Sequence, residues 1–436
     1  MHYGSTVYGP AHTDSHQDDY QEPQADTFAD AARNGWAFYQ SLQLPDGHWA
    51  CGYGGPSFLL PGLIFAMYIT EYSIPHEWAQ EMIRYLETHV NDDGGWGLHL
   101  EGPSTVLATG LYYTALRLLG LDVGHELTTK ARMCLLALGG AIGIPQWGKI
   151  WLSCLNLYSW EGMHPIPPDF WLLPDWMPMH PWRWWVQCRV VYLPTSYLYS
   201  KRFAMPLNPL LLEIREEIYT QSYSDIDFAR HKSTVAAADI KKPHSILLKI
   251  INVALKLWET LLRPAWLLRR AQGRVYELIK REDENTNYND LAPVNKAFQM
   301  VSVFCEEGVD SPRVKTHQRQ LPTYLWLGHD GMTCSGTNGV QVWDTAFSIQ
   351  AAVEAGLADE PKFQASLTAA LQFMEMSQLD SNLTDPYRQQ RKGGWPFSTK
   401  DNGYIVSDCA AEGLKAVMML QKHSYVFDNA YEQTKN

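Results

Sequence analysis

Gln43-Leu-Pro-Asp-Gly47-His-Trp49 is the stretch from which this chain is best understood, because its pattern Q-x3-G-x-W returns further along. The segment 389–395 matches the pattern fully, and the segment 90–96 matches it except that Val90 replaces the glutamine. Trp49 and Trp96 lie 47 residues apart. A period of this length is that of one helical hairpin in an α/α repeat. The repeat therefore predicts stacked pairs of helices.

Each of these turns is followed by an apolar run with helical spacing. Ser104 can cap the run 105–119, and Gly120 can end it. The runs 343–355 and 408–420 follow the same logic. Strict alternation of apolar and polar residues, which marks half-buried strands, is scarce. We therefore predict an all-α chain.

Three segments depart from the helical repeat. The stretch 145–206 is dense in Trp and Pro, so at least residues 165–181 should be irregular. Residues 244–270 are strongly apolar but are interrupted by charges, which makes the run too broken for a spanning helix. That segment is either a buried helix, the commoner outcome for such a pattern, or a helix lying at a membrane interface. Residues 281–289 are the best candidate linker.

Length and composition limit which classes of function are possible. The 436 residues are enough for two or three domains or one large barrel. A formal charge of −12 argues against a nucleic-acid partner but does not exclude a membrane surface. Residues 1–28 are polar, and we expect a disordered tail. The cysteines lack a Cys-x-x-Cys pair, which indicates a reducing compartment and no structural zinc; they are Cys51, Cys134, Cys154, Cys188, Cys305, Cys334 and Cys409.

The pair Asp408-Cys409 is the strongest candidate for chemistry. The simpler interpretation is that Ser407 or Asp408 caps a helix. The functional interpretation is a general acid. Burial among aromatic rings would keep Asp408 protonated, and a hydrogen bond from Cys409 and the positive end of the helix would stabilise the carboxylate left after proton transfer. Spacing alone leaves both interpretations open.

A set of aromatic residues lies near turns rather than on helix stripes. Core packing is the ordinary explanation for any one of them. As a set they can attract a cation through their ring faces, by ~0.5–2 kcal/mol each in a dry site. They would steady a carbocation without offering it a nucleophile; the set is Tyr53, Trp147, Trp185, Trp343 and Phe397.

Metal and cofactor patterns are not found in the sequence. No His-Glu-x-x-His or paired-histidine spacing occurs, and no Gly-rich phosphate loop stands in a strand context. His180, His244 and His329 are isolated, and Asp92 and Asp93 fit a turn before two glycines. We therefore expect no metal and no cofactor.

Taken together, these blocks resemble the oxidosqualene cyclases, the triterpene cyclases of the lanosterol-synthase type. The resemblance rests on the Q-x3-G-x-W repeats, the segment 184–197 (WWVQCRVVYLPTSY), the run 341–347 (QVWDTAF) and 408–412 (DCAAE). It covers nearly all of residues 30–425 in family order. What it implies is a monotopic membrane enzyme that folds 2,3-oxidosqualene in a cavity between two α/α barrels and protonates the epoxide. The product would be a tetracyclic triterpene alcohol of the lanosterol or protostadienol type.

The resemblance also assigns positions and domains. The acid falls on Asp408, its supporting cysteine on Cys409, and the cation-facing aromatics on the five residues named above. Gln187 stands where lanosterol-forming enzymes commonly have His, near the late cations. Residues 29–290 would form one complete barrel, with 244–270 facing the membrane, and residues 291–436 the first part of a second barrel. The expected location is the cytosolic face of the endoplasmic reticulum or of lipid droplets.

Two departures qualify what the resemblance implies. Ala410 replaces the usual Thr after the Asp-Cys pair, and the chain stops soon after that pair. We therefore expect the chain to be inactive alone, or active only with a complementary half. Two other classes stay open. A prenyltransferase subunit would need a zinc site of Asp, Cys and His, and a non-catalytic cyclase fragment would bind lipid or act as a scaffold.

Overall fold

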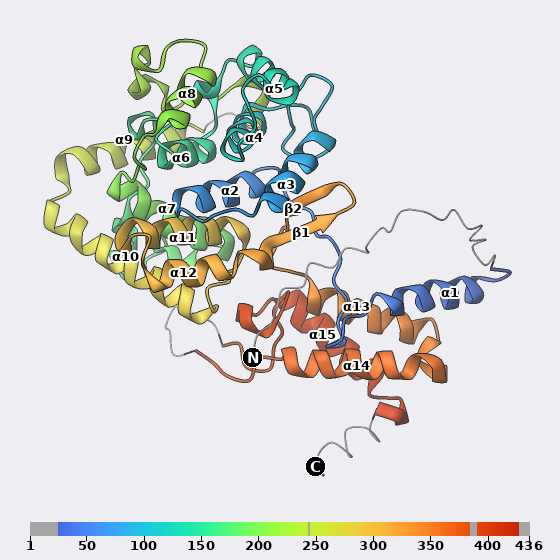
Figure 1. Cartoon of the computed structure of the whole chain (residues 1–436). Coiled ribbons are helices and arrows are strands. Elements are labelled where there is room, and N and C mark those ends of the chain that lie inside the picture. The colour runs from blue at the N-terminus through green and yellow to red at the C-terminus, as the bar shows by residue number, and fades with distance from the viewer. Residues whose placement is uncertain (1–24, 243–244, 384–389, 427–436) are drawn as a thin grey trace. The chain divides into compact units, whose positions relative to one another are not determined.

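The computed structural model describes residues 25–242, 245–383 and 390–426. These residues form α-helices α1 to α15, several short 3₁₀ turns and a single two-stranded hairpin (Figure 1). The prediction of an all-α chain of the α/α barrel class is confirmed. Most of the predicted tail 1–28 lies outside the described residues. Its last residues lead into α1 (Phe28–Ser41), where the Thr27 hydroxyl caps the helix by accepting from the Asp30 N–H.

Packing divides the chain into two units. Unit 1 comprises Gly54–Glu284 and Tyr288–Gly336, and unit 2 comprises Asn285–Asn287 with the described parts of Tyr8–Tyr53 and Thr337–Asn436. The units do not follow the predicted ranges 29–290 and 291–436. Helix α1 packs against α14 (Pro361–Ser377), and α11 (Pro293–Glu307) packs against α2 (Leu59–Ile69) and α7 (Val186–Lys201). The predicted barrel boundaries stay a prediction.

Unit 1 is built around two mostly buried helices, α2 and α11. Helix α2 is apolar on every side, as expected of a helix enclosed by neighbours. It packs against α11 and α4 (Val106–Leu118). Trp151 closes this core by stacking on Phe298 at 3.9 Å. The remaining helices of the unit are α3 (His76–Thr88), α5 (Glu126–Ala137), α6 (Gln146–Cys154), α8 (Pro209–Glu217), α9 (Ile246–Leu257), α10 (Ala265–Asn285) and α12 (Pro312–Arg319).

Unit 2 has its own apolar core. Helices α13 (Gln341–Glu354), α14 and α15 (Ser407–Leu420) pack against one another. The N-terminal segment adds Trp36 and Trp49 to the same cluster of buried residues. Residues far apart in the sequence therefore share this core.

The three Trp turns share one set of contacts. The Trp49 indole N–H donates to the Tyr39 carbonyl at 2.9 Å, that of Trp96 to the Leu86 carbonyl at 3.0 Å, and that of Trp395 to the Met374 carbonyl at 2.7 Å. Each acceptor lies in the last turn of the preceding helix, where carbonyls lack the i+4 partner of a helix interior. The turn glycines Gly47, Gly94 and Gly393 all have positive φ.

Some local expectations were wrong. Helix α4 is capped by Thr105 rather than Ser104, because the Thr105 hydroxyl reaches the Ala108 N–H. Residues 281–285 belong to α10 instead of a linker, since Glu282 and Asp283 are buried. The hairpin of β1 (Leu325–Gly328) and β2 (Gly331–Cys334) was not predicted. Its two-residue loop is His329-Asp330, which is not one of the preferred hairpin dipeptides, so the signal in the sequence was weak.

The irregular stretch agrees with expectation. Of the two alternatives for the apolar segment, the structure contradicts only the buried helix, and the helix at a membrane interface stays a prediction. Residues 165–181 contain only short 3₁₀ turns such as Pro168–Leu172. Helix α9 has no buried residue, and most of its apolar side chains are exposed, so the buried alternative is wrong. A π-helical turn, Trp258–Leu262, follows it. Within the described residues, no helix has both the length and the apolar content to cross a membrane.

Candidate functional site

The candidate acid Asp408 is the second residue of α15. The helix begins at Ser407, and the N-cap residue is Val406, which makes no side-chain cap. Capping by Ser407 or Asp408 is therefore wrong, because both residues already lie inside the first helical turn. The Ser407 hydroxyl donates to the Asp408 carboxylate at 3.1 Å. The carboxylate thus stands at the positive end of the α15 dipole.

Cys409 and Asp408 have opposite environments. Cys409 is fully buried in the unit 2 core, and this burial, with the Asp408 charge beside it, raises the pKa of the thiol to about 12. The thiol therefore keeps its proton and can act as a weak donor. Asp408 is exposed to solvent in this chain. The expectation that aromatic rings bury it does not hold within the described residues.

Three of the five candidate aromatics come together in unit 2. Trp343 stacks on Phe397 with ring centroids 5.1 Å apart and planes at 16°, and Tyr53 meets Phe397 edge-on at 5.7 Å. The pairing is reinforced by the backbone, since the Trp343 N–H donates to the Phe397 carbonyl. This cluster joins the start of α13 to the turn that precedes α15.

A half-buried carboxylate that sequence reasoning did not single out lies next to this cluster. Asp344 accepts a hydrogen bond from the Cys51 N–H at 2.8 Å. Burial raises the pKa of Asp344, and the hydrogen bond partly opposes that rise. Its place beside Trp343 in the sequence was the only available hint.

The other candidates belong to unit 1. Trp147 packs edge-on against Phe58 at 5.6 Å and against Phe298 at 5.7 Å. Trp185 is 70% exposed at the N-cap of α7, and Gln187 is half-buried in the first turn of that helix. The structure thus brings three of the candidates together in unit 2 and shows no contact between Trp147 and the pair at the start of α7 among the described residues; their roles at a substrate stay predictions.

A buried ionic network joins α10, α11 and α12 in unit 1. Asp283, Asp290 and His317 offer ligand atoms within 4.8 Å of one another, the arrangement that a metal would need. The Lys296 ammonium lies 2.9 Å from His317 Nδ1 and already brings a positive charge to the cluster. Sequence reasoning missed this network because positions 283, 290, 296 and 317 form no recognised spacing.

Burial governs the titration of this network. It raises the pKa of Asp283 and raises that of Asp290 to about 7. It lowers the pKa of Lys296 to about 8 and lowers that of His317. Burial therefore disfavours the charged form of each of these groups, and the network connects the ends of three helices.

Comparison with known proteins finds similarity to one kind of enzyme, the cyclases of squalene and oxidosqualene. The family model of the squalene-hopene cyclase N-terminal domain matches residues 33–327. A lanosterol synthase of Pneumocystis carinii is 49% identical over 405 residues, which cover 92% of this chain and 56% of that protein. The human lanosterol synthase is 44% identical, with 92% and 55% covered, and a cycloartenol synthase of Dictyostelium discoideum is 44% identical, with 92% and 57% covered. The chain spans about half the length of these relatives.

Proposed function

Since the chain belongs to the squalene-hopene cyclase N-terminal domain family, we propose that it is the acid-bearing part of an enzyme that cyclises 2,3-oxidosqualene. The observation that carries this proposal is its 44–49% identity to lanosterol synthases over 92% of its length. The product is a tetracyclic alcohol of the lanosterol or protostadienol type. The relative named cycloartenol synthase and the human lanosterol synthase are each 44% identical to this chain. The identity therefore supports the class of reaction more firmly than the ring skeleton of the product.

The proposed chemistry is an isomerisation that needs no co-reactant. Asp408 gives its proton to the epoxide oxygen, a C–O bond breaks, and the double bonds of the chain close the rings in turn. A final proton loss balances the first proton gain. The positive end of α15 stabilises the Asp408 carboxylate as it forms, and the faces of Trp343 and Phe397 attract the cation.

Because Asp408 is exposed to solvent, it can act as the proposed acid only if other protein atoms shield it from water. Water would quench carbocations and weaken each cation–π contact. Helices α13 and α15 also present apolar side chains to solvent, among them Phe347, Leu414 and Met418. We propose that further polypeptide covers this surface, corresponding to the part of the relatives that this chain does not span.

The test is cyclisation with and without such a cover. The chain is mixed with the complementary part of the Pneumocystis carinii relative, and products from 2,3-oxidosqualene are separated by gas chromatography. We expect product only from the mixture, and none when Asp408→Asn is used. Asp401→Asn, which changes another exposed carboxylate of unit 2, should leave the yield unchanged. Full activity of Asp408→Asn in the mixture would exclude Asp408 as the acid.

A non-catalytic role is the second candidate, and the exposure of Asp408 is the observation in its favour. In that case the chain binds oxidosqualene without turnover. The mixture would yield no product, and Asp408→Asn would bind the substrate as tightly as the parent chain. Binding is measured with radiolabelled substrate after gel filtration.

We also propose that unit 1 docks on a membrane surface, at the endoplasmic reticulum or a lipid droplet. The support is the exposed apolar face of α9, which includes Ile246, Leu247 and Ile250 and lies at the periphery of unit 1 (Figure 1). Such a helix, with lysines on its other face, is typical of interfacial binding. Co-flotation with vesicles should be lost in Leu247→Ser/Ile250→Ser; unchanged flotation of this variant would remove the face as the anchor.

A further inference from the structure

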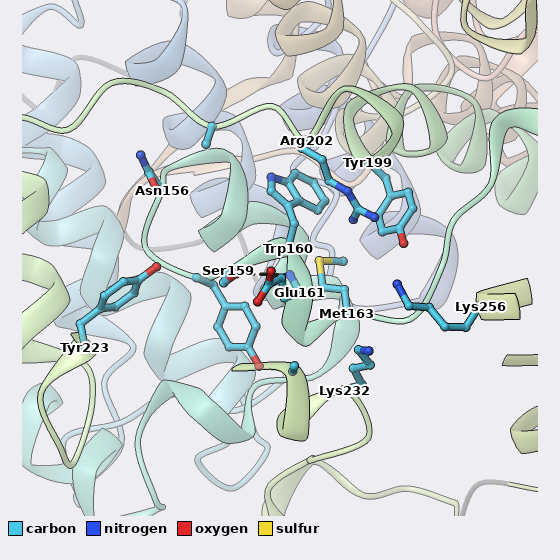
Figure 2. Close-up of a pocket in the computed structure, with 13 residues that line it drawn as sticks. Asn156, Ser159, Trp160, Glu161, Met163, Tyr199, Arg202, Tyr223, Lys232 and Lys256 are labelled. Carbon is cyan, nitrogen blue, oxygen red and sulfur yellow. Dashed lines mark hydrogen bonds between the residues drawn. The ribbon is translucent and has the colours of Figure 1, made fainter. Parts of the chain in front are cut away.

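A cavity of about 600 Å³ opens in unit 1 at the C-terminal end of α9. Its wall is formed by the turn at Trp160–Gly162, the end of α7, the chain around Lys232, and α9 itself through Lys256 (Figure 2). The proposed acid and the candidate aromatics are not among its lining residues. The cavity is therefore separate from the residues proposed to carry out cyclisation.

Positive charge dominates the wall of this cavity. Lys232 and Lys256 line it, and no carboxylate of the described residues lies within 4 Å of either ammonium group. Arg202 also lines it, but its guanidinium is held by Glu259 at 2.6 Å. Glu161 is the one acidic lining residue of the cavity in the described part of the chain. The site thus suits an anion that also carries a hydrogen-bond donor.

A buried hydroxyl in the same wall points to a ligand independently of the charges. Tyr158 is only 2% exposed, and its hydroxyl has no hydrogen-bond partner in the described part of the chain. Burial raises the pKa of Tyr158, so the hydroxyl keeps its proton and can donate. An unpaired buried donor destabilises the protein, and an acceptor on a ligand would relieve that cost.

The cavity is lined in part by α9, the helix proposed to meet the membrane. Lys256 lies on α9, whose apolar side chains are exposed. Glu259, just after α9, binds both Arg202 and the Tyr199 hydroxyl, so the cavity wall is tied to the apolar segment. Residues 241–274 hold four Lys and four Arg but only one acid, Glu259, in a chain of net charge −12. Segments of this kind are attracted to anionic lipid surfaces.

We propose that this cavity binds the headgroup of an anionic glycerophospholipid at the membrane surface. Lys232, Lys256 and the Tyr158 hydroxyl donate to the phosphate, and Glu161 accepts from a hydroxyl or ammonium group of the headgroup. Charge-assisted hydrogen bonds of this type are the strong ones in recognition of phosphate. The inference rests on the proposed membrane docking and deepens it by naming the lipid class.

The experiment measures binding of the full chain to vesicles of phosphatidylcholine alone and of phosphatidylcholine with phosphatidylinositol. Lys232→Gln/Lys256→Gln is compared with Lys241→Gln/Lys242→Gln, which removes the same charge from exposed positions outside the cavity. We expect the cavity pair to lower the preference for the anionic vesicles about tenfold more than the control pair does. Tyr158→Phe, which changes no charge, should lower the preference about fivefold. Soluble glycerophosphoinositol should compete with the vesicles.

The outcomes separate the two proposals. Equal losses in both lysine pairs, with no effect of Tyr158→Phe, would show diffuse attraction and overturn the cavity as a headgroup site. Equal binding of the parent chain to both vesicle types would also overturn it while leaving the membrane docking intact. Failure to bind either vesicle would refute the docking itself.

Discussion

At the scale of single residues, the Trp turns explain why the repeat pattern has the letters it has. The tryptophan supplies a ring for the core and an N–H for the last turn of the preceding helix, as at Trp96 and Leu86. The glycine supplies a positive φ. In the first turn the glutamine side chain closes the loop by donating to the Gly47 carbonyl at 2.7 Å. These local demands are readable from sequence.

A pair of glycine substitutions separates backbone strain from crowding. Gly393 has φ +87° and open space where an alanine Cβ would lie, whereas a Cβ at Gly47 would lie 2.1 Å from the Ala369 carbonyl oxygen. We expect Gly393→Ala to lower the free energy of unfolding of unit 2 by about 1 kcal/mol. Gly47→Ala should lower it by about 3 kcal/mol or more, since the backbone must move. Urea denaturation of both variants checks this, and equal losses would contradict it.

Cysteine reactivity tests the environments of the free thiols. Cys188 is exposed and Cys409 is fully buried, with a pKa of about 12. Iodoacetamide at pH 8 should alkylate Cys188 within minutes and leave Cys409 unmodified until the chain is denatured. Peptide mass spectrometry reads both positions from one sample. Alkylation of native Cys409 at a rate comparable with Cys188 would show that the start of α15 opens.

The environment of Asp408 illustrates what sequence could not supply. The Asp-Cys pair at a helix start was visible, and so was its likeness to an acid motif. Whether Asp408 is buried or exposed could not be predicted, because that depends on which other segments lie over the first turn of α15. The same holds for α9, where an amphipathic pattern fixes which face is apolar but leaves open whether protein or lipid covers that face.

At the scale of elements, the α10–α11–α12 junction depends on a charge balance that pH can shift. In the folded chain the Asp290 pKa is raised to about 7 from 3.8, so this group's contribution to stability falls as pH rises from about 4 to 7. Lys296 limits the fall, because its charge favours the ionised carboxylates. Removing that charge should push the folded pKa values of Asp283 and Asp290 higher still and extend the fall to higher pH.

Lys296→Met should therefore be less stable than the parent chain by an amount that grows from pH 5 to pH 9, reaching about 3 kcal/mol. The Lys296 pKa itself, about 8 when folded against 10.5, acts in the same direction, since the parent chain gains stability as pH rises through that interval. Urea midpoints across this pH range supply the measurement. Lys315→Met, an exposed change on α12, is the control and should show no such trend. A pH-independent deficit for Lys296→Met would exclude the linkage.

At the scale of the whole molecule, the two packing units were the least predictable feature. Each Trp turn and each helix could be recognised from a short stretch of sequence. The helix against which α1 packs could not be recognised in this way. Trp36 and Trp49 enter a core made by helices that begin some 300 residues later, at Gln341. Such long-range contacts leave no periodic trace in the sequence, because they are set by the way helix pairs stack.

Two tryptophan truncations test whether the units respond separately. Trp49 is buried in unit 2, and Trp151 is buried in unit 1 against Phe298. Replacing either by Ala should cost about 3–5 kcal/mol in its own unit. In hydrogen exchange with mass spectrometry, Trp49→Ala should speed exchange in α13, α14 and α15 and leave α2, α4 and α11 as in the parent chain. Trp151→Ala should give the reverse pattern, because each unit has its own compact core and can open locally. Faster exchange in both units for either variant would mean that the two cores unfold as one cooperative structure.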